Sequence, residues 1–109
     1  MRLMEQHALL GAVLVCACHT DLGEPSEAIA GYYNRPWKWD AIKSNAGPFG
    51  IMQFHSEDDP FIPMGEARYV AESLSSDFRA YEDRSHFFTN SDADIVLQHV
   101  VERLKRMHE

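Results

Sequence analysis

Residues 49–63 read FGIMQFHSEDDPFIP, an apolar run followed by three consecutive acids and two prolines. The run from Phe49 to Phe54 predicts a buried strand. The polar stretch from His55 to Pro63 predicts a loop at the carboxyl end of that strand, made rigid by its prolines. Because reactive groups in open α/β sheets sit on loops that leave the carboxyl ends of strands, this stretch predicts both the fold class and one side of a site.

The amino-terminal part of the chain contains one strand pattern and three helix patterns. Residues 1–7 have the spacing of the tail of a helix. The apolar residues 10–17 predict a central parallel strand that is buried on both faces. Residues 25–32 and 35–43 predict short helices, the second with Pro36 near its first position.

The carboxyl-terminal part continues the alternation of strands and helices. Residues 63–76 have the apolar spacing of an amphipathic helix, and residues 78–81 predict a short strand. A last helix is expected to run from an N-cap at Ser91 or Asp92 to about Met107. The sequence therefore predicts an α/β fold of three layers, in which a small parallel sheet of about three strands has helices on both faces.

Length and charge limit the classes of function. With 109 residues, the chain is expected to form a single domain over residues 1–109. Its formal net charge is -7, with 17 Asp and Glu residues against 10 Lys and Arg residues. Because phosphates and anionic membrane surfaces are bound by clustered Lys and Arg, neither nucleic acid nor membrane is an expected partner.

The two cysteines bear on the cellular compartment. Cys16 and Cys18 lie one residue apart, where a disulfide between them would be strained and would close no useful loop. Reduced cysteines favour an intracellular, cytoplasmic protein. Secretion is the alternative, because residues 8–18 have the length of the apolar region of a signal peptide. Cleavage near Ala17 would then leave a small secreted protein.

A second polar loop, residues 82–88, follows the strand predicted over residues 78–81 and carries His86. A catalytic triad needs a carboxylate beside an imidazole, because the acid keeps one ring nitrogen protonated while the other accepts the nucleophile's proton. The order of acid before histidine matches α/β-hydrolases, in which the serine comes first. No G-x-S-x-G nucleophile motif occurs. The structural alternative is that Asp58 and Asp59 are turn residues before a proline and that His86 is an ordinary loop residue.

Metal binding is a further alternative, which draws on Cys16, Cys18, His19, His55 and His86. The Cys-x-Cys-His spacing differs from that of zinc sites, and buried cysteines in a strand are more often small core residues. The sequence therefore predicts no metal and no other cofactor.

Two strings, RPWKW at residues 35–39 and DDPFIP at residues 58–63, resemble the retinoblastoma-binding protein 9 family of serine hydrolases. Shorter similar segments follow in the same order along nearly the whole chain: Val13-Leu14-Val15, Asp21-Leu22-Gly23, Gly31-Tyr32-Tyr33-Asn34, Ile42-Lys43, Gln53-Phe54, and Asp83 with His86-Phe87. The resemblance implies the C-terminal half of an α/β-hydrolase-like fold.

By the same resemblance, Asp59 matches the triad acid and His86 the triad histidine. The family's first half, with a G-H-S-S-G nucleophile elbow and an L-x-C-x-E retinoblastoma-binding string, has no counterpart in these residues. Residues 1–7 look similar to the end of the nucleophile-bearing helix, so we expect the chain to begin shortly after the serine. The chain departs from the family at Cys16, Cys18, His19 and His55, and His55 is expected to perturb Asp59 electrostatically.

Five further residues are expected to line or modulate the crevice beside the acid and histidine: Asp58, His55, Trp37, Phe61 and Phe87. Trp37 and Trp39 lie two residues apart on a predicted helix, so they are expected to face different directions, with at least one partly exposed.

Three functions remain open from the sequence. The first is half of a serine hydrolase, inactive alone, that acts on a small ester or acyl substrate only when a missing half completes it. The second is a binding or assembly module, in which the exposed edge of the strand at residues 10–17 pairs with a second copy or with a complementing chain. The third is the small secreted protein described above.

Overall fold

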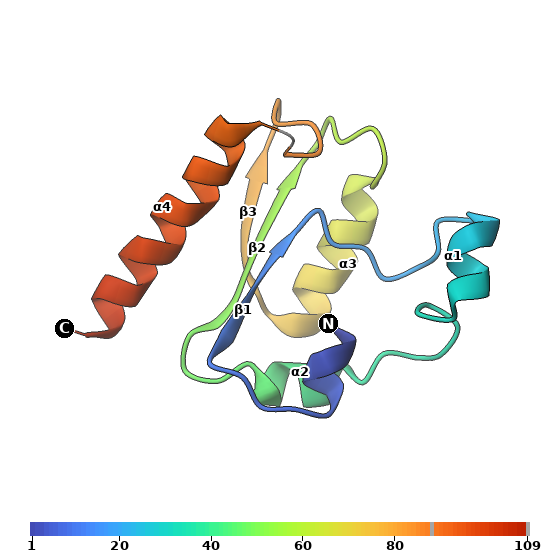
Figure 1. Cartoon of the computed structure of the whole chain (residues 1–109), viewed down its shortest axis with the longest axis horizontal. Coiled ribbons are helices and arrows are strands. Elements are labelled where there is room, and N and C mark those ends of the chain that lie inside the picture. Colours follow the sequence, from blue (N-terminus) through green and yellow to red (C-terminus); the bar gives the residue numbers. More distant parts are fainter. Residues whose placement is uncertain (88, 109) are drawn as a thin grey trace.

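The computed structural model describes residues 1–87 and 89–108 and contains one sheet of three parallel strands. The strands are β1 (Gly11–Val15), β2 (Gly50–Ser56) and β3 (Asp77–Tyr81), and β2 lies between the other two (Figure 1). The carboxyl ends of all three strands therefore lie at the same edge of the sheet. The predicted α/β fold with a small parallel sheet is confirmed.

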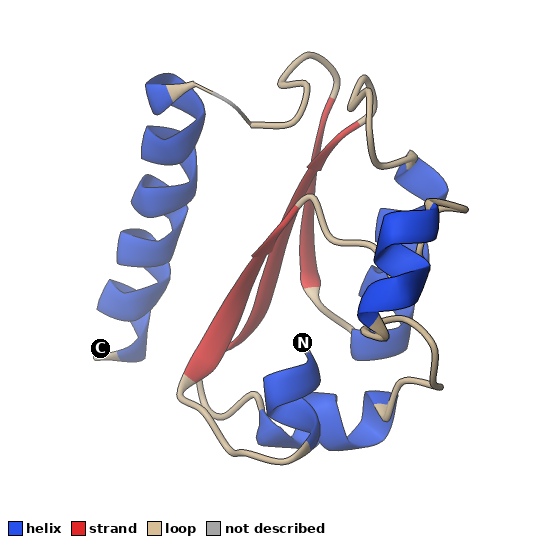
Figure 2. Cartoon of the chain, turned by 45° about the vertical axis from the view of Figure 1, so that its right-hand side comes forward, coloured by secondary structure: helices blue, strands red, loops and turns tan. Residues whose placement is uncertain are grey.

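Helices lie on both faces of this sheet (Figure 2). Helix α4 (Asn90–Met107) lies on one face, and helices α2 (Trp39–Asn45) and α3 (Met64–Leu74) lie on the other with the 3-10 turn η1 (Arg2–Glu5). Helix α1 (Pro25–Ala30) lies to one side, away from the sheet (Figure 1). The three predicted layers are present.

Two hydrophobic clusters hold the layers together, one on each face of β2. Ile51 belongs to the cluster under η1, α2 and α3, whose other buried members are Met4, Ile42, Ala46, Val70 and Leu74. Met52 and Phe54 point to the opposite face, where Phe49 joins them against Val96, Val100 and Leu104 of α4. Because neighbouring side chains of a strand point to opposite faces, both faces of β2 are buried.

Strand β1 corrects one prediction. Its residues are half-buried and Val15 is exposed, whereas Ile51 to Ser56 of β2 are all buried. The strand buried on both faces is therefore β2, and the prediction that residues 10–17 form this central strand was wrong. The reason is position in the sheet, since β1 has a strand neighbour on one side only within the described residues. An apolar run does not reveal whether its strand is central or at an edge.

Helix α2 begins later than predicted. The sequence pattern placed a helix over residues 35–43 with Pro36 near its first position, but α2 starts at Trp39. Because Trp37 precedes the helix, its ring stacks on that of Trp39, with centroids 5.6 Å apart, and does not face a different direction. The short helices at η1, α1 and α3 occur within the predicted segments.

The start of helix α4 is fixed by a residue that the sequence pattern did not select. Thr89 is the N-cap: its side chain accepts a hydrogen bond from the backbone N–H of Asp92, and the Asp92 carboxylate accepts one from the N–H of Thr89. Both N-cap candidates, Ser91 and Asp92, lie inside the helix, because this reciprocal capping box requires the acid three residues after the cap. Among the described residues, no helix has the length and apolar character needed to cross a membrane.

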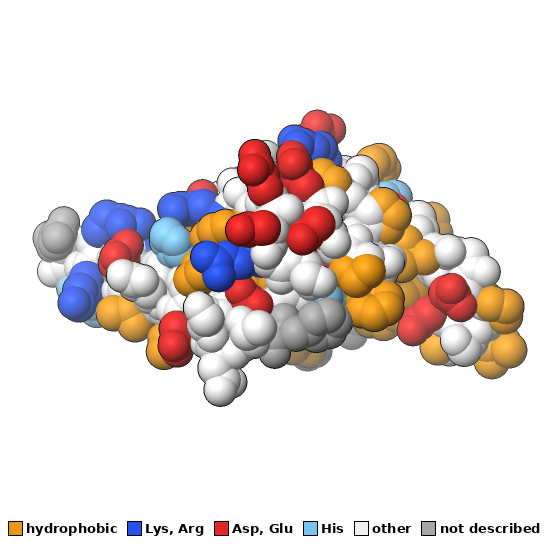
Figure 3. Space-filling model, turned by 90° about the horizontal axis from the view of Figure 1, so that it is seen from above, with side chains coloured by type: hydrophobic (Ala, Val, Ile, Leu, Met, Phe, Trp, Pro, Cys, Tyr) orange, Lys and Arg blue, Asp and Glu red, His pale blue; other side chains and the backbone are white. Residues whose placement is uncertain are grey.

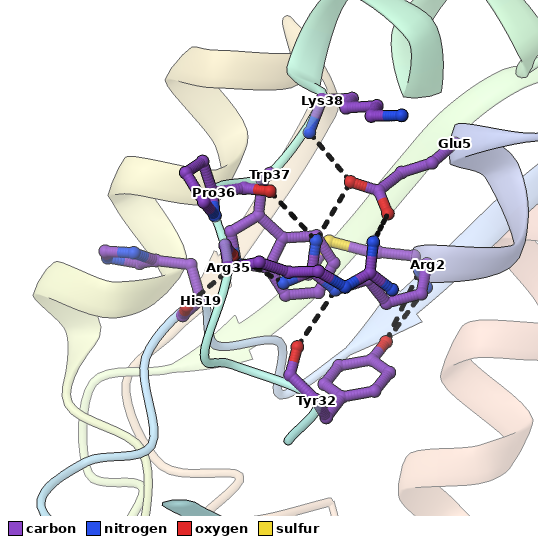
Figure 4. A network of polar contacts seen from close by, with 9 residues as sticks. Arg2, Glu5, His19, Tyr32, Arg35, Pro36, Trp37 and Lys38 are labelled. Carbon is purple, nitrogen blue, oxygen red and sulfur yellow. Dashed lines mark hydrogen bonds and ion pairs between the residues drawn. The ribbon is translucent and has the colours of Figure 1, made fainter.

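A polar network around Arg2 ties η1 to the segment before α2 (Figure 4). The Arg2 guanidinium donates to the backbone carbonyls of Tyr32, Arg35 and Pro36. It also lies over the Trp37 ring, 3.7 Å from the centroid, and pairs with Glu5 at 2.9 Å. These contacts join Arg2 to residues 30 or more positions later in the chain. They hold the short turn η1 against the segment that precedes α2.

Candidate active site

The acid and the histidine selected from the sequence meet at the carboxyl edge of the sheet. Asp59 lies in the loop after β2, and His86 lies in the loop after β3. The two strands are parallel neighbours, so both loops leave the same edge. The Nδ1 atom of His86 lies 2.8 Å from Oδ2 of Asp59. The fold therefore brings together the two residues that the sequence paired.

Backbone donors position the acid. Oδ1 of Asp59 accepts hydrogen bonds from the N–H groups of Phe61, at 2.8 Å, and Ile62, at 3.0 Å. Burial of the Asp59 side chain acts to raise its pKa, but these N–H groups, His86 and Cys16 outweigh burial and hold the pKa below its usual value. Asp59 is therefore ionised at neutral pH and accepts a hydrogen bond from the Nδ1–H group of His86.

Asp58 joins the acid loop to the histidine loop. Its Oδ1 accepts hydrogen bonds from Oγ of Ser56 at 2.6 Å and from the backbone N–H of Ser85 at 2.8 Å. Oγ of Ser56 accepts in turn from the N–H of Arg84 at 2.9 Å. The Ser56 hydrogen bond, followed by that of Ser85, lowers the pKa of Asp58. Asp58 acts on the site through the backbone next to His86.

The histidine is held in a strained turn. Its neighbours Ser85 and Phe87 both have positive φ values, 52° and 55°, in the left-handed region that residues with a Cβ atom rarely adopt. Phe61 packs edge-on against the His86 ring, with centroids 5.3 Å apart. Arg84 pairs with Asp92 at 3.3 Å, which ties the loop to the start of α4. Backbone strain of this kind often accompanies functional residues.

A cavity of about 860 Å³ borders the histidine. Its lining comes from the loop after β1, from α1 and the segment after it, from the acid loop, from α3 and from the histidine loop: Cys16, Cys18, Thr20, Asp21, Leu22, Glu24, Glu27, Tyr33, Pro60, Phe61, Ile62, Pro63, Glu66 and His86. Among the residues that the structure describes, the lining includes four carboxylates and neither Lys nor Arg. It therefore suits a neutral or cationic ligand better than an anionic one.

The surface over the two site loops is also acidic. Figure 3 looks onto this edge of the molecule and shows acidic side chains gathered there. The exposed acids of the two loops are Glu57, Asp58, Glu82 and Asp83.

The chain is similar in sequence to a known serine hydrolase. The chain is 42% identical over 87 residues to Serine hydrolase RBBP9 of Rattus norvegicus. The predicted resemblance to the retinoblastoma-binding protein 9 family is confirmed. The match covers 80% of this chain and 46% of the rat protein, so the chain spans about half the length of this relative. No family model matches the chain.

A solved structure supports the fold independently. The crystal structure of the ydeN gene product from B. subtilis superposes with a TM-score of 0.71, covering 93% of this chain and 58% of that one. At 17% identity, this likeness shows the fold alone, which is α/β-hydrolase-like. The RBBP9 relationship and this fold together make the chain a hydrolase-like domain.

The remaining predicted site residues lie in different places. Phe61 lines the cavity beside His86. His55 is fully buried in β2, 3.9 Å from the Asp59 carboxylate, although the sequence placed it in the loop.

Trp37 belongs to the Arg2 network and donates a hydrogen bond from Nε1 to the carbonyl of His19. Phe87 packs against Phe54 and Tyr81 on the α4 side of the sheet.

No described serine lines the cavity. Cys16 does, at the end of β1, and burial followed by the neighbouring Asp59 raises the pKa of its thiol to about 12. Cys16 is thus a protonated thiol at neutral pH and a poor nucleophile. Neither the contact between Cys16 and Asp59 nor the Ser56 bridge could be found by sequence reasoning, because both depend on the alignment of separate strands.

Proposed function

We propose that this chain supplies the acid and histidine of a serine-hydrolase site and needs a nucleophile from outside the residues described. The observation that carries the proposal is the 2.8 Å contact between Nδ1 of His86 and an Asp59 carboxylate fixed by two backbone N–H groups. The relationship to Serine hydrolase RBBP9 supports it.

The chemistry follows from the protonation states. Ionised Asp59 holds the proton of His86 on Nδ1, so Nε2 carries the lone pair. That lone pair accepts the proton of a serine hydroxyl as the hydroxyl attacks an acyl carbon, and Asp59 stabilises the resulting imidazolium. The proton then passes to the leaving alcohol. The substrate class is a small carboxylic ester or other acyl compound, bound in the cavity beside His86.

A fluorophosphonate probe, which labels activated serines, tests this proposal. The isolated chain is expected to remain unlabelled. When the chain is joined to the segment of rat RBBP9 that it does not match, labelling is expected to appear. His86→Ala then lowers the labelling rate at least about 100-fold, because the base is lost. The matched control is His108→Ala, which removes an exposed histidine at the end of α4.

Two results would contradict the proposal. One is stoichiometric labelling of the isolated chain that His86→Ala abolishes, which would reveal a nucleophile within these residues. The other is labelling of the joined protein that is equally fast with and without His86.

A second candidate function is self-assembly along β1. An apolar groove of about 370 Å³ lies between β1 and α4, lined by Val13, Val15, Phe87, Asp92, Ala93, Val96, Leu97 and Val100. Val15 and Leu97 are exposed. We propose that a second copy, or the complementing segment where one is present, pairs with the open edge of β1 and covers this groove.

Light scattering tests the assembly proposal. The isolated chain is expected to be a dimer, and Leu97→Glu is expected to shift it to monomer because a charge enters the apolar contact. Gln98→Glu is the control, since it adds the same charge at the neighbouring exposed position. A stable monomer at high concentration would overturn this proposal.

We further propose a cytoplasmic location, which the two unpaired cysteines support. Mass spectrometry of the amino terminus separates this proposal from secretion. Cleavage near Ala17 would remove β1 and its five pairings with β2, so the protein is expected to keep those residues.

A further inference from the structure

Three residues of different chemical type converge beneath the cavity. Cys16 follows the end of β1, His55 lies near the end of β2, and Asp59 lies in the loop after β2. One ligand atom from each, the Cys16 sulfur, a ring nitrogen of His55 and a carboxylate oxygen of Asp59, lie within 4.8 Å of one another. Thiolate, imidazole and carboxylate are the three ligand types that Zn²⁺ takes from proteins.

The His55 ring has an unsatisfied atom. Its side chain is fully buried, and its Nε2 lies 2.9 Å from the carbonyl of Ile62. Its Nδ1 is buried without a hydrogen-bond partner among the described residues. Because a carbonyl oxygen only accepts, Nε2 carries the proton of the neutral ring and Nδ1 carries the lone pair that an ion could bind. Buried polar atoms in native proteins are almost always paired, and an unpaired one points to a missing ligand.

The Cys16 thiol lies beside a negative charge that a cation would balance. Its raised pKa comes from burial and from the carboxylate of Asp59. A divalent cation reverses this effect, because its positive charge favours the thiolate over the thiol. Cys16 also lines the cavity, which gives an ion a path from solvent and room for a water molecule as a fourth ligand.

We propose that Cys16, His55 and Asp59 form a binding site for a divalent transition-metal ion such as Zn²⁺. Binding forms bonds from the ion to sulfur, nitrogen and oxygen, and the thiol proton leaves to solvent. No oxidation or reduction occurs. A protein ligand set of one sulfur, one nitrogen and one carboxylate oxygen suits a four-coordinate ion whose fourth position is water.

Metal binding would disable the acid and histidine pair. Oδ2 of Asp59, the atom 2.8 Å from Nδ1 of His86, also lies close to the His55 ring, 3.9 Å from its Nε2, and the neighbouring Nδ1 of that ring offers the lone pair. An ion held between His55 and Asp59 draws the carboxylate toward itself and takes negative charge away from His86. The inhibitory consequence rests on the proposed hydrolase function, whereas the metal site itself does not.

Cobalt spectroscopy of the full chain provides the test. Titration with Co²⁺ is expected to give the visible absorption of a four-coordinate ion and a near-ultraviolet band from the sulfur-to-cobalt bond, both saturating at one ion per chain. Zn²⁺ is expected to displace the cobalt and remove both features. Because no substrate is involved, the result is independent of hydrolase activity.

The two cysteines supply matched variants. Cys16→Ser is expected to abolish the sulfur-to-cobalt band and to weaken Zn²⁺ binding at least about 10-fold, whereas Cys18→Ser, which also changes a half-buried cavity thiol, leaves both unchanged. Circular dichroism checks that each variant folds. Asp59→Asn is expected to weaken binding while the sulfur band remains. The proposal is overturned if Co²⁺ gives no sulfur band, or if the band survives in Cys16→Ser.

Discussion

Glu5 and Asp59 are both buried carboxylates with basic partners, but the surroundings of Glu5 suit it to stabilising the fold and those of Asp59 suit it to positioning a histidine. Each side chain is 1% exposed. Glu5 faces the guanidinium groups of Arg2 and Arg35 and accepts from the backbone N–H of Lys38. Asp59 faces a histidine that is one-third exposed and borders a cavity. Burial alone therefore does not mark a functional acid.

The difference lies in the partner. Arginine stays protonated at every physiological pH, so the ion pairs of Glu5 keep their charge and connect η1 to the segment before α2. The imidazole of His86 has a second ring nitrogen that can accept a proton while Asp59 holds the first, so the Asp59 pair is suited to proton transfer. The comparison predicts that disturbing Glu5 damages the fold, whereas disturbing Asp59 damages chemistry more than the fold.

The largest effect on stability is expected for Glu5→Gln. The change leaves Arg2, whose side chain is 9% exposed, without its counter-charge, and breaking a buried pair in this way costs about 3–5 kcal/mol. Urea unfolding measures the loss. Glu102→Gln, at an exposed position of α4, is the control and should change stability by less than about 0.5 kcal/mol. An equal loss of unfolding free energy in Glu5→Gln and Glu102→Gln would show that Glu5 stabilises the fold no more than an exposed acid does.

A smaller loss of stability is expected for Asp59→Asn. The amide keeps the shape of the carboxylate but weakens the charge-assisted hydrogen bonds from His86, Phe61 and Ile62, which corresponds to about 2 kcal/mol. In the protein joined to the RBBP9 segment, the same change should slow probe labelling far more than His108→Ala does. An Asp59→Asn protein that is less stable than Glu5→Gln would reverse the proposed roles.

Acid should destabilise the protein through both carboxyls. Burial opposes ionisation of Glu5, but the Lys38 N–H and the two arginines outweigh burial and lower its pKa; the pKa of Asp59 is also lowered. A lowered pKa in the folded state means that the unfolded chain takes up protons first as the pH falls. The stability from these groups is therefore complete above about pH 5 and is lost progressively as the pH falls below that value.

Urea unfolding at a series of pH values measures this loss. Each carboxyl contributes at most about 1.4 kcal/mol per pH unit over that window, so Glu5→Gln and Asp59→Asn should each reduce the slope. An unchanged slope in both variants would contradict the lowered pKa values.

The smallest effect is expected for Trp37→Phe. The phenyl ring keeps stacking against Trp39 and the contact with Arg2, but it loses the indole N–H that donates to His19 at 2.8 Å. One such hydrogen bond is worth about 1 kcal/mol in urea unfolding. A loss larger than that of Glu5→Gln would show that the ring, and not the ion pair, holds the segment.

The site loops were predictable from the sequence, whereas the network around Arg2 was not. The two loops that carry Asp59 and His86 were found because each follows a strand, and parallel strands bring their carboxyl ends together, whereas the choice of Asp59 over Asp58 came from the family resemblance. The Arg2 network was not found, because it joins residues about 30 positions apart through backbone carbonyls that no side-chain pattern encodes. The late start of α2 at Trp39 follows from that network, since the carbonyls of Arg35 and Pro36 bind Arg2.

The prediction that the strand at residues 10–17 is buried on both faces failed for a related reason. The run at residues 10–17 is more apolar than β2, which contains Gln53, His55 and Ser56, so the difference between an edge and a central strand lies in the neighbouring strands and not in the strand's own sequence. The contact between Cys16 and Asp59 depends on the register of Val15 with Phe54, which only the assembled sheet sets.

The protonation site of His86 tests the central claim most directly. Long-range proton–nitrogen NMR of the isolated chain, recorded with the His86 ring in its neutral form, shows which ring nitrogen carries the proton. An ionised Asp59 at 2.8 Å requires the proton on Nδ1 and the lone pair on Nε2, and Asp59→Asn should shift the population away from that form. A His86 ring protonated on Nε2 in the unmodified chain would contradict the assignment of this pair as the acid and base of a hydrolase.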